Sequence, residues 1–468
     1  MSLRACFVPL TVLAILTGPV PLAQTSVARA ESLGAAVRSA LTAHPEVKAR
    51  DAEVRATIHD LARLRGEYQP TVTLRGGLGA EYVDDPTSLS AADNAETKLT
   101  SNIGVEAEVV LFDGLRRANR VYANAARVDG TYFQMLDASE SMALNAVEAY
   151  IDVLRHGQLL DVAQRNLRRH REIRRQVGEL VDGGRIPASD ALQVDDRLIA
   201  AEMAVIDVRE AREIAAARYA AVIGHAPAAP MSYGAAPGLP GQVGTLVRNA
   251  VQNSFRVGYY NSLIDQRAFE REAADADYKP RLSLNAGASV GSNLGGSRGE
   301  ETEARIGLNL RWNLYNGGRS AQVAAAGERR NKALYQRMAA IRDVEELSRR
   351  AWAEYRSAVE MNLLLDRQLR TNRQIVRQYD EEFQASKRTL LDVLEAERVF
   401  HNTLFQQVGA EASRRFAEYR LIGVQSRLAA HFGVKPSLTA LDAPRDVVSE
   451  RGAKSLLNQA IPPLRSRD

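Results

Sequence analysis

Residues capable of acid–base or metal chemistry occur along the chain, but they form no recognisable catalytic motif. The seven histidines are scattered, and the sequence contains no HExxH motif, no paired-cysteine spacing and no phosphate-binding loop. The neighbouring acids Asp195-Asp196 and Glu381-Glu382 could act as acid/base pairs, but solvated helix faces explain them more simply. The sequence therefore predicts a protein that is not an enzyme and has no cofactor.

Another acidic pair, Asp392 and Glu395, has a spacing of three that puts both carboxylates on one helix face. Such a pair can attract cations. Two solvated acids on an exposed helix are the simpler alternative. The elements that position the pair must decide between these interpretations.

The chain contains one structural unit twice, and this unit provides the elements that position the pair. Residues 68–74 and 278–284 each follow a helix-patterned segment and open a run of alternating polar and apolar residues. Further along, residues 111–114 align with 314–317, and residues 185–192 align with 387–394. The offset falls from about 210 to about 202 because the loop of the first repeat is longer.

Four segments alternate as β-strands do: about 70–83, 99–112, 281–291 and 303–315. One face of each strand is apolar, and the charged residues of the other faces are Arg75, Glu81, Glu106, Glu108, Arg281, Arg305 and Arg311. For any single strand, a soluble antiparallel sheet with one wet face is the simpler interpretation. The aromatic residues near the strand ends are Tyr82, Phe112, Trp312 and Tyr315. Together these features favour an outer-membrane β-barrel with the charged residues lining its lumen.

Four strands are too few to close a barrel around a pore. An open strand edge in lipid would leave backbone groups unpaired, at several kcal/mol each. We therefore expect copies of the chain to share one barrel. The connections within the strand pairs, residues 84–90 and 291–297, are polar and turn-rich, which is typical of extracellular loops.

Two segments, about 117–181 and 320–385, contain no helix breaker apart from isolated glycines. Each predicts a helix on the order of 100 Å long. The apolar residues Leu144, Val147, Ile151 and Leu154 step by three and four, the spacing of a coiled-coil seam. Antiparallel return helices are expected over 188–222 and 390–429. The first reversal contains glycine and proline and the second contains neither, so the second is located less sharply.

The organisation follows from these elements. The sequence predicts a signal peptide over 1–30, a first repeat over 31–224, a proline-rich linker over 225–242, a second repeat over 243–430 and an irregular tail over 431–468. Shorter helices precede the strands at about 33–66 and 243–274. Pro45 is expected to break the first of them.

The N-terminal segment indicates export. Arg4 precedes an apolar stretch, and residues 28–30 form an A-x-A cleavage site. A transmembrane helix is the alternative, but the stretch is shorter than the ~20 residues that a bilayer requires. The single cysteine, Cys6, lies within the signal, so we expect neither a disulfide nor an N-terminal lipid anchor. With 61 basic and 57 acidic residues, the charge balance requires no nucleic-acid partner.

At this point the chain resembles the TolC-like outer membrane efflux proteins across nearly all of its mature length. The resemblance rests on the duplicated helix-strand-strand-helix-helix order, on the strand exits at 111–114 and 314–318, and on residues 388–396. It implies an α+β membrane protein of the cell outer membrane that extends into the periplasm. Three chains would form a twelve-stranded β-barrel continued by a twelve-helix α-barrel. The implied partners are outer-membrane lipid, a periplasmic adaptor and an inner-membrane ABC or proton-driven transporter.

The resemblance also assigns roles to residues at the hairpin tips. Asp392 and Glu395 fall where the family narrows its periplasmic entrance with acidic rings, although Glu395 stands where aspartate is common. Arg388 falls where a bridge to Ser189 and Asp190 would hold the entrance closed. Phe383 stands where a hydrogen-bonding tyrosine is expected, so this closing link lacks its hydroxyl.

Two transport roles remain open within this resemblance. The absent lipid-site cysteine and the style of the loop at 84–87 favour type I secretion of large proteins. Efflux of drugs and small molecules is the alternative. A remote alternative is a periplasmic coiled-coil protein without transport function, which would explain the long helices but not the lipid-suited strands.

Overall fold

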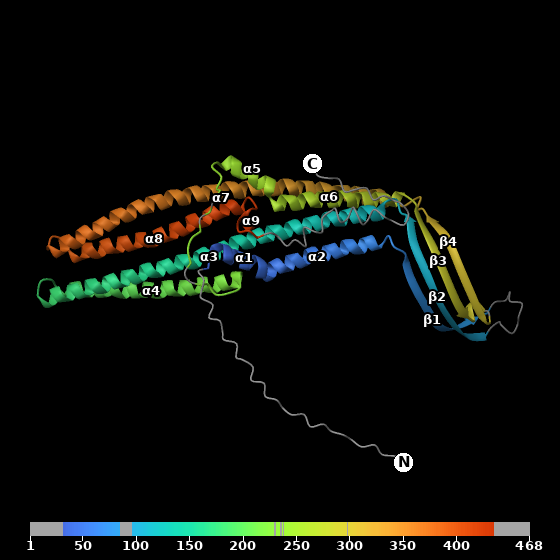
Figure 1. Ribbon diagram of the computed structural model, residues 1–468, viewed down its shortest axis with the longest axis horizontal. Coiled ribbons are helices and arrows are strands. Elements are labelled where there is room, and N and C mark those ends of the chain that lie inside the picture. The colour runs from blue at the N-terminus through green and yellow to red at the C-terminus, as the bar shows by residue number, and fades with distance from the viewer. Residues whose placement is uncertain are drawn as a thin grey trace, which may run out of the picture.

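The protein, described here by a computed structural model, is an elongated bundle of helices that ends in a four-stranded sheet (Figure 1). The structure describes residues 31–84, 96–228, 231–234, 236, 238–296 and 298–434. The expected signal peptide, most of the loop at 84–90 and the tail from residue 435 lie outside the described residues.

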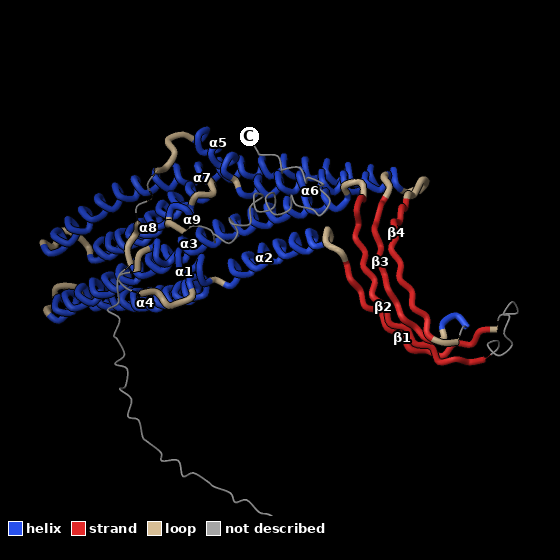
Figure 2. The backbone as a smooth tube through the Cα atoms, turned by 45° about the vertical axis from the view of Figure 1, so that its right-hand side comes forward, coloured by secondary structure: helices blue, strands red, loops and turns tan. Residues whose placement is uncertain are grey.

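The described elements follow the duplicated order (Figures 1 and 2). The first repeat contains α1 (Leu33–Ala43), α2 (Pro45–Gly66), β1 (Thr71–Val83), β2 (Glu96–Phe112), α3 (Arg116–Asp182) and α4 (Ala188–Ile223). The second contains α5 (Val243–Asn253), α6 (Phe255–Asp275), β3 (Arg281–Ser292), β4 (Glu300–Arg311), α7 (Arg319–Gln384), α8 (Leu390–Gly423) and α9 (Leu428–His431), with 3-10 turns at Ala276–Tyr278 and Leu294–Gly296.

The sheet is antiparallel in the order β1-β2-β3-β4, so β1 and β4 are its edges. Strand β4 ends at Arg311, short of the predicted residue 315. Arg311 pairs with Arg281, the first residue of β3, and the preceding Pro280 has no N–H for a further ladder bond. Strand β2 begins at Glu96, before the predicted residue 99, because Glu96 still pairs with Val83 of β1.

Helices α3 and α7, of 67 and 66 residues, give the molecule its length. At 1.5 Å per residue each is about 100 Å long, as predicted. Each packs against its return helix, α3 with α4 and α7 with α8 (Figure 1). The predicted seam is confirmed by burial, since Val147, Ile151 and Leu154 are buried in the core and Leu144 is partly buried against it.

The two reversals have the same backbone hydrogen bonds. In the first, Gly184 adopts φ 67° and the N–H of Arg185 donates to the carbonyl of Leu180 at 2.9 Å. In the second, Ser386 adopts φ 55° and the N–H of Lys387 donates to the carbonyl of Glu382 at 2.8 Å. A serine thus takes the left-handed conformation that glycine supplies in the first repeat, which is why the second reversal carries no composition signal.

The predicted break at Pro45 is confirmed, but the predicted single helix over 243–274 is wrong. Helices α5 and α6 are separated at Ser254, whose hydroxyl accepts from the N–H of Val257 at 3.3 Å and caps α6. The predicted helix over 390–429 also divides, because the chain turns at Ser426 between α8 and α9.

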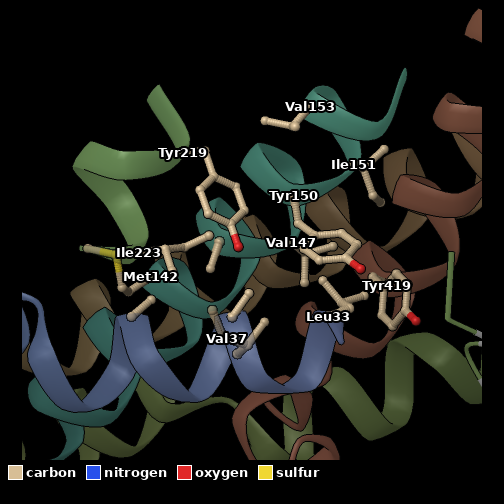
Figure 3. Packing of buried hydrophobic residues seen from close by; sticks show 14 of the residues in the cluster. Leu33, Val37, Met142, Val147, Tyr150, Ile151, Val153, Tyr219, Ile223 and Tyr419 are labelled. Atoms are coloured by element: carbon tan, nitrogen blue, oxygen red, sulfur yellow. The ribbon is translucent and has the colours of Figure 1, made fainter. Parts of the chain in front are cut away.

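The main core lies midway along the bundle, where α1, α3, α4, α8 and α9 meet (Figure 3). Tyr150, Tyr219 and Tyr419 are almost fully buried there. The Tyr150 hydroxyl lies within hydrogen-bond distance of two carbonyls, that of Glu31 at 2.9 Å and that of Ser232 at 3.1 Å, and shares its one hydrogen between them. These contacts tie Glu31, just before α1, and the inter-repeat linker to α3.

Candidate functional site

The register of the sheet places all seven predicted lumen residues on one face. Thr71 pairs with Glu108, Glu108 with Asn285, and Arg281 with Arg311, so the polar sets of adjacent strands lie opposite each other. Side chains alternate along each strand, which brings Arg75, Glu81, Glu106, Glu108, Arg281, Arg305 and Arg311 to the same side.

Several of these charges are paired across or along the strands. Arg75 contacts Glu106 at 3.1 Å, and Arg281 contacts Glu108 at 3.4 Å. Arg305 contacts Glu303 at 3.0 Å, and Glu81 accepts from the N–H of Gly295 at 3.0 Å. Exposed pairs of this kind add at most about 1 kcal/mol each to stability, so they mainly make the face wet and charged.

The opposite face is apolar and uncovered in the single chain. Leu78 is 88% exposed, Ile306 76% and Leu308 66%. Tyr82 and Trp312 are also exposed, toward the two ends of the strands. A contiguous apolar face of this size marks contact with lipid or with another protein.

The acidic pair at the second hairpin tip is held by local partners. Asp392 accepts from the Thr389 hydroxyl at 2.7 Å and completes a capping box at the start of α8. This hydrogen bond lowers the pKa of Asp392, and hydrogen bonding from Arg398 lowers the pKa of Glu395. Both carboxylates are therefore ionised at neutral pH, although Glu395 is partly neutralised by Arg398, which lies 2.5 Å away.

The predicted bridge from Arg388 to Ser189 and Asp190 is not formed within one subunit. Arg388 instead pairs with Glu382 at 2.8 Å, and its guanidinium lies 4.0 Å from the centre of the Tyr379 ring. The reason is local: the turn returns Arg388 over the last residues of α7, whereas Ser189 and Asp190 belong to the other hairpin.

Phe383 has a packing role in place of the missing hydroxyl. It lies against an apolar cluster of Ile173, Val177, Val194, Leu390 and Leu394. This cluster contains residues from α3, α4 and α8, so it joins the tips of both hairpins.

An ion-pair link between the hairpins was missed from the sequence. Arg169 of α3 contacts Glu397 of α8 at 2.5 Å and Asp380 of α7 at 3.0 Å. Glu397 is buried, and the adjacent His401 is buried in the same region. Arg169 belongs to an arginine-rich stretch of α3. The periodicity of this stretch indicates a polar helix face but not the partner of any one arginine. The available signal was Glu397, an acidic residue among mostly apolar neighbours at the start of the buried face of α8.

The described residues contain neither a metal-binding cluster nor a membrane-spanning helix. No group of three or more histidine, cysteine or acidic side chains there could hold a metal ion. Among the helices in the described part of the chain, none has the length and apolar character needed to cross a membrane.

An amphipathic sheet at one end and paired long hairpins at the other define a channel-forming transport protein rather than an enzyme. The chain matches the family described as "Outer membrane efflux protein" over residues 36–225 and 246–424, most of its length. The chain belongs to this family, and its place is the outer membrane with an extension into the periplasm.

Individual relatives agree with this assignment. The chain is 24% identical over 434 residues to the outer membrane efflux protein BepC of Brucella suis biovar 1 (strain 1330), covering 91% of this chain and 92% of BepC. Its fold is similar to that of CusC, with a TM-score of 0.74, 16% identity and coverage of 84% of this chain and 91% of CusC. The CmeC channel of Campylobacter jejuni gives a TM-score of 0.73 at 14% identity, covering 90% and 89%.

Proposed function

We propose that three copies of the chain assemble into a channel-tunnel with a twelve-stranded β-barrel and a twelve-helix periplasmic barrel. The observation that carries this proposal is the four-stranded sheet with two free edges, β1 and β4, and one apolar face. Pairing β4 of one copy with β1 of the next satisfies both edges and closes the sheet. The charged face then lines the lumen.

Introduced cysteines test the shared barrel. Within one chain, β1 and β4 are separated by three strand spacings, about 14 Å, which exceeds the reach of a disulfide. A Thr73→Cys variant combined in turn with Gly307→Cys, Asn309→Cys or Arg311→Cys is expected to give covalent dimers and trimers for one register. Thr73→Cys alone is the control. If every combination remains monomeric under oxidation, the shared barrel is wrong.

We also propose that the hairpin tips form the periplasmic entrance, where Asp392 and Glu395 of three subunits form an acidic ring. Their ionised state supports cation preference. An Asp392→Asn, Glu395→Gln variant keeps the capping acceptor but removes the charges, so its cation selectivity in planar bilayers should fall. Glu381→Gln, on the exposed end of α7, is a matched charge control. Equal ion selectivity in all three proteins would refute the ring.

A latch between subunits is proposed for Arg388. To reach Ser189 and Asp190 of a neighbouring copy, Arg388 must exchange its contact with Glu382. Arg388→Ser is expected to raise single-channel conductance. Unchanged conductance would argue against the latch.

The proposed role is export through a periplasmic adaptor and an inner-membrane ABC or proton-driven transporter, with type I protein secretion as the first candidate. The lipid-site cysteine is absent from the sequence, which supports this choice. Small-molecule efflux is the second candidate, and it is favoured by the similarity to an efflux protein. A strain that lacks the gene, and the same strain complemented with the wild-type chain, decide between them. If the deletion abolishes secretion of a protein without making the cells drug-sensitive, secretion is supported. If it makes the cells drug-sensitive without affecting secretion, efflux is supported.

A further inference from the structure

The junction between the sheet and the helices contains one arginine from each repeat in the same setting. In the first repeat, the guanidinium of Arg117 lies 4.5 Å from the centre of the Tyr68 ring and donates to the carbonyl of Val110 at 2.8 Å. It also contacts the carboxylate of Asp113 at 2.8 Å. Arg117 is buried, and Asp113 compensates its charge.

In the second repeat, Arg319 occupies the equivalent setting, although it aligns in sequence with Arg116, and it has no such compensation. Its guanidinium lies 4.7 Å from the centre of the Tyr278 ring and donates to the carbonyl of Asn313 at 2.6 Å. The position of Asp113 is occupied by Asn316, which has no charge. Arg319 is only 6% exposed, and its Nε atom is buried without a hydrogen-bond partner. A buried cation that lacks a counter-charge is unfavourable unless an anion reaches it.

Arg319 lines a cavity of about 550 Å³ on the polar face of the sheet, where the helices begin. Seven cationic and four acidic side chains line this cavity. Four of the cations have acidic partners: Arg116 with Asp277, Arg117 with Asp113, Arg120 with Glu67 and Arg281 with Glu108. Among the described residues, Arg311, Arg319 and Lys279 form no ion pair. The cavity therefore has an excess of three positive charges.

Helix geometry adds to this excess. Helices α3 and α7 both begin beside the cavity. At α3 the carboxylate of Asp113 already accepts from the N–H of Arg117 at 3.1 Å, whereas Gly318 provides no side-chain cap for α7. Free N–H groups and the helix dipole at an N-terminus favour an anion.

We propose that this cavity binds a small oxyanion of the phosphate class, which supplies Arg319 with the counter-charge that Asp113 supplies to Arg117. The anion approaches from the aqueous polar face. It is either free phosphate or a phosphate group carried by a larger molecule.

Trp312 provides a reporter for binding, because its indole N–H donates to the carbonyl of Tyr278 at 3.1 Å, beside Arg319. The sequence contains two tryptophans, so a Trp352→Phe background isolates this signal. Inorganic phosphate is titrated at constant ionic strength into the purified full-length protein in detergent. A saturable fluorescence change is expected.

Three variants in that background test the assignment. Asn316→Asp introduces the missing carboxylate and should weaken phosphate binding at least tenfold, as should Arg311→Gln, whose side chain is exposed and whose loss should not affect folding. Arg75→Gln lies elsewhere on the same face, paired with Glu106, and should bind as the parent does. Absence of saturable binding, or equal weakening by Arg75→Gln and Arg311→Gln, would overturn the proposal. So would undiminished binding by both Asn316→Asp and Arg311→Gln.

A second titration with glycerol 3-phosphate distinguishes the sources. Binding of both ligands supports a site that accepts phosphate attached to a larger molecule, and binding of inorganic phosphate alone supports a free-ion site. Because the readout is binding rather than conductance, the result is independent of the proposed transport function.

Discussion

The two repeats have the same backbone plan but different polar partners. At the strand-to-helix junction, both place an arginine over a tyrosine ring, yet only the first repeat supplies a carboxylate. At the hairpin tip, both use a left-handed residue, but only the second follows it with a capping box, at Thr389 and Asp392. In the first repeat, Pro187 stands at that position without a side-chain cap.

The difference shows which features the repeated fold requires. Strand alternation and reversal geometry are needed in both halves, because a failure in either would expose backbone groups or apolar surface. The polar partners can differ without changing the backbone plan, so the two repeats can use them for separate functions. Exchanging these partners between the repeats therefore tests the comparison directly.

The largest effect is expected from Asp113→Asn, which gives the first junction the composition of the second. Arg117 and Asp113 have side-chain exposures of only 8% and 11%, so the variant leaves a buried guanidinium uncompensated. We expect a loss of about 3 kcal/mol in the free energy of unfolding. Denaturant unfolding in detergent, followed by circular dichroism, measures it. The reciprocal Asn316→Asp should not destabilise the protein, and equal losses in both variants would contradict the comparison.

A pH-dependent effect is expected where the repeats meet at Glu140. This carboxylate accepts from the N–H groups of Leu428 and Ala429, at 2.8 and 3.1 Å, and burial raises its pKa to about 7. Since the pKa is higher in the folded state, the corresponding stability is present below about pH 4.5 and is lost as the pH rises through 7. The change is on the order of 3 kcal/mol.

Glu140→Gln should abolish this pH dependence. The amide resembles the protonated carboxyl, so the variant should match wild type at pH 5 and exceed it in stability at pH 8, where wild type carries a buried charge. Unfolding free energies at several pH values check this. Parallel curves for the two proteins would show that Glu140 does not titrate as inferred.

A smaller effect is expected from the one-sided link at Arg169. Arg169 reaches Asp380 and Glu397 of the second repeat. The residue of the second repeat that aligns with Arg169 is Thr371, which has no charge, so the link has no counterpart. Arg169→Gln leaves Glu397 buried without its cation and should cost about 2 kcal/mol, reduced because Arg169 is partly exposed. Arg171→Gln, whose pair with Glu202 is exposed, should change stability by less than about 1 kcal/mol. Hydrogen exchange at the hairpin tips should increase in the first variant only.

The smallest effect is expected from Thr389→Ala, which removes the cap that distinguishes the second tip. Loss of an N-cap typically costs about 1 kcal/mol. The change should appear as faster amide exchange in the first turn of α8. The matched Ser189→Ala substitution, at an exposed position in α4, should leave exchange in that helix unchanged.

Much of this architecture could be predicted because its signals are periodic. The alternation around Leu74 and Leu308, and the seam through Val147 and Ile151, determine which faces are apolar regardless of distant contacts. Breaks at Ser254 and Ser426 were missed because serine, although favoured at caps, also occurs on helix surfaces, so a single serine does not mark a helix end. The roles predicted at the tips were less complete, since Arg388 found Glu382 rather than the other hairpin.

The sequence by itself determined the duplication, the two faces of every strand and the lengths of the hairpins, because each follows from local periodicity and chain geometry. Tertiary structure decided the pairing of charges. Whether Arg319 has a counter-ion, or whether Arg169 is solvated or joins two hairpins, depends on side chains brought together from positions far apart in the chain. Pairs three or four residues apart on one helix can be read from the sequence, but partners from distant segments are set by distance in space, which no local pattern encodes.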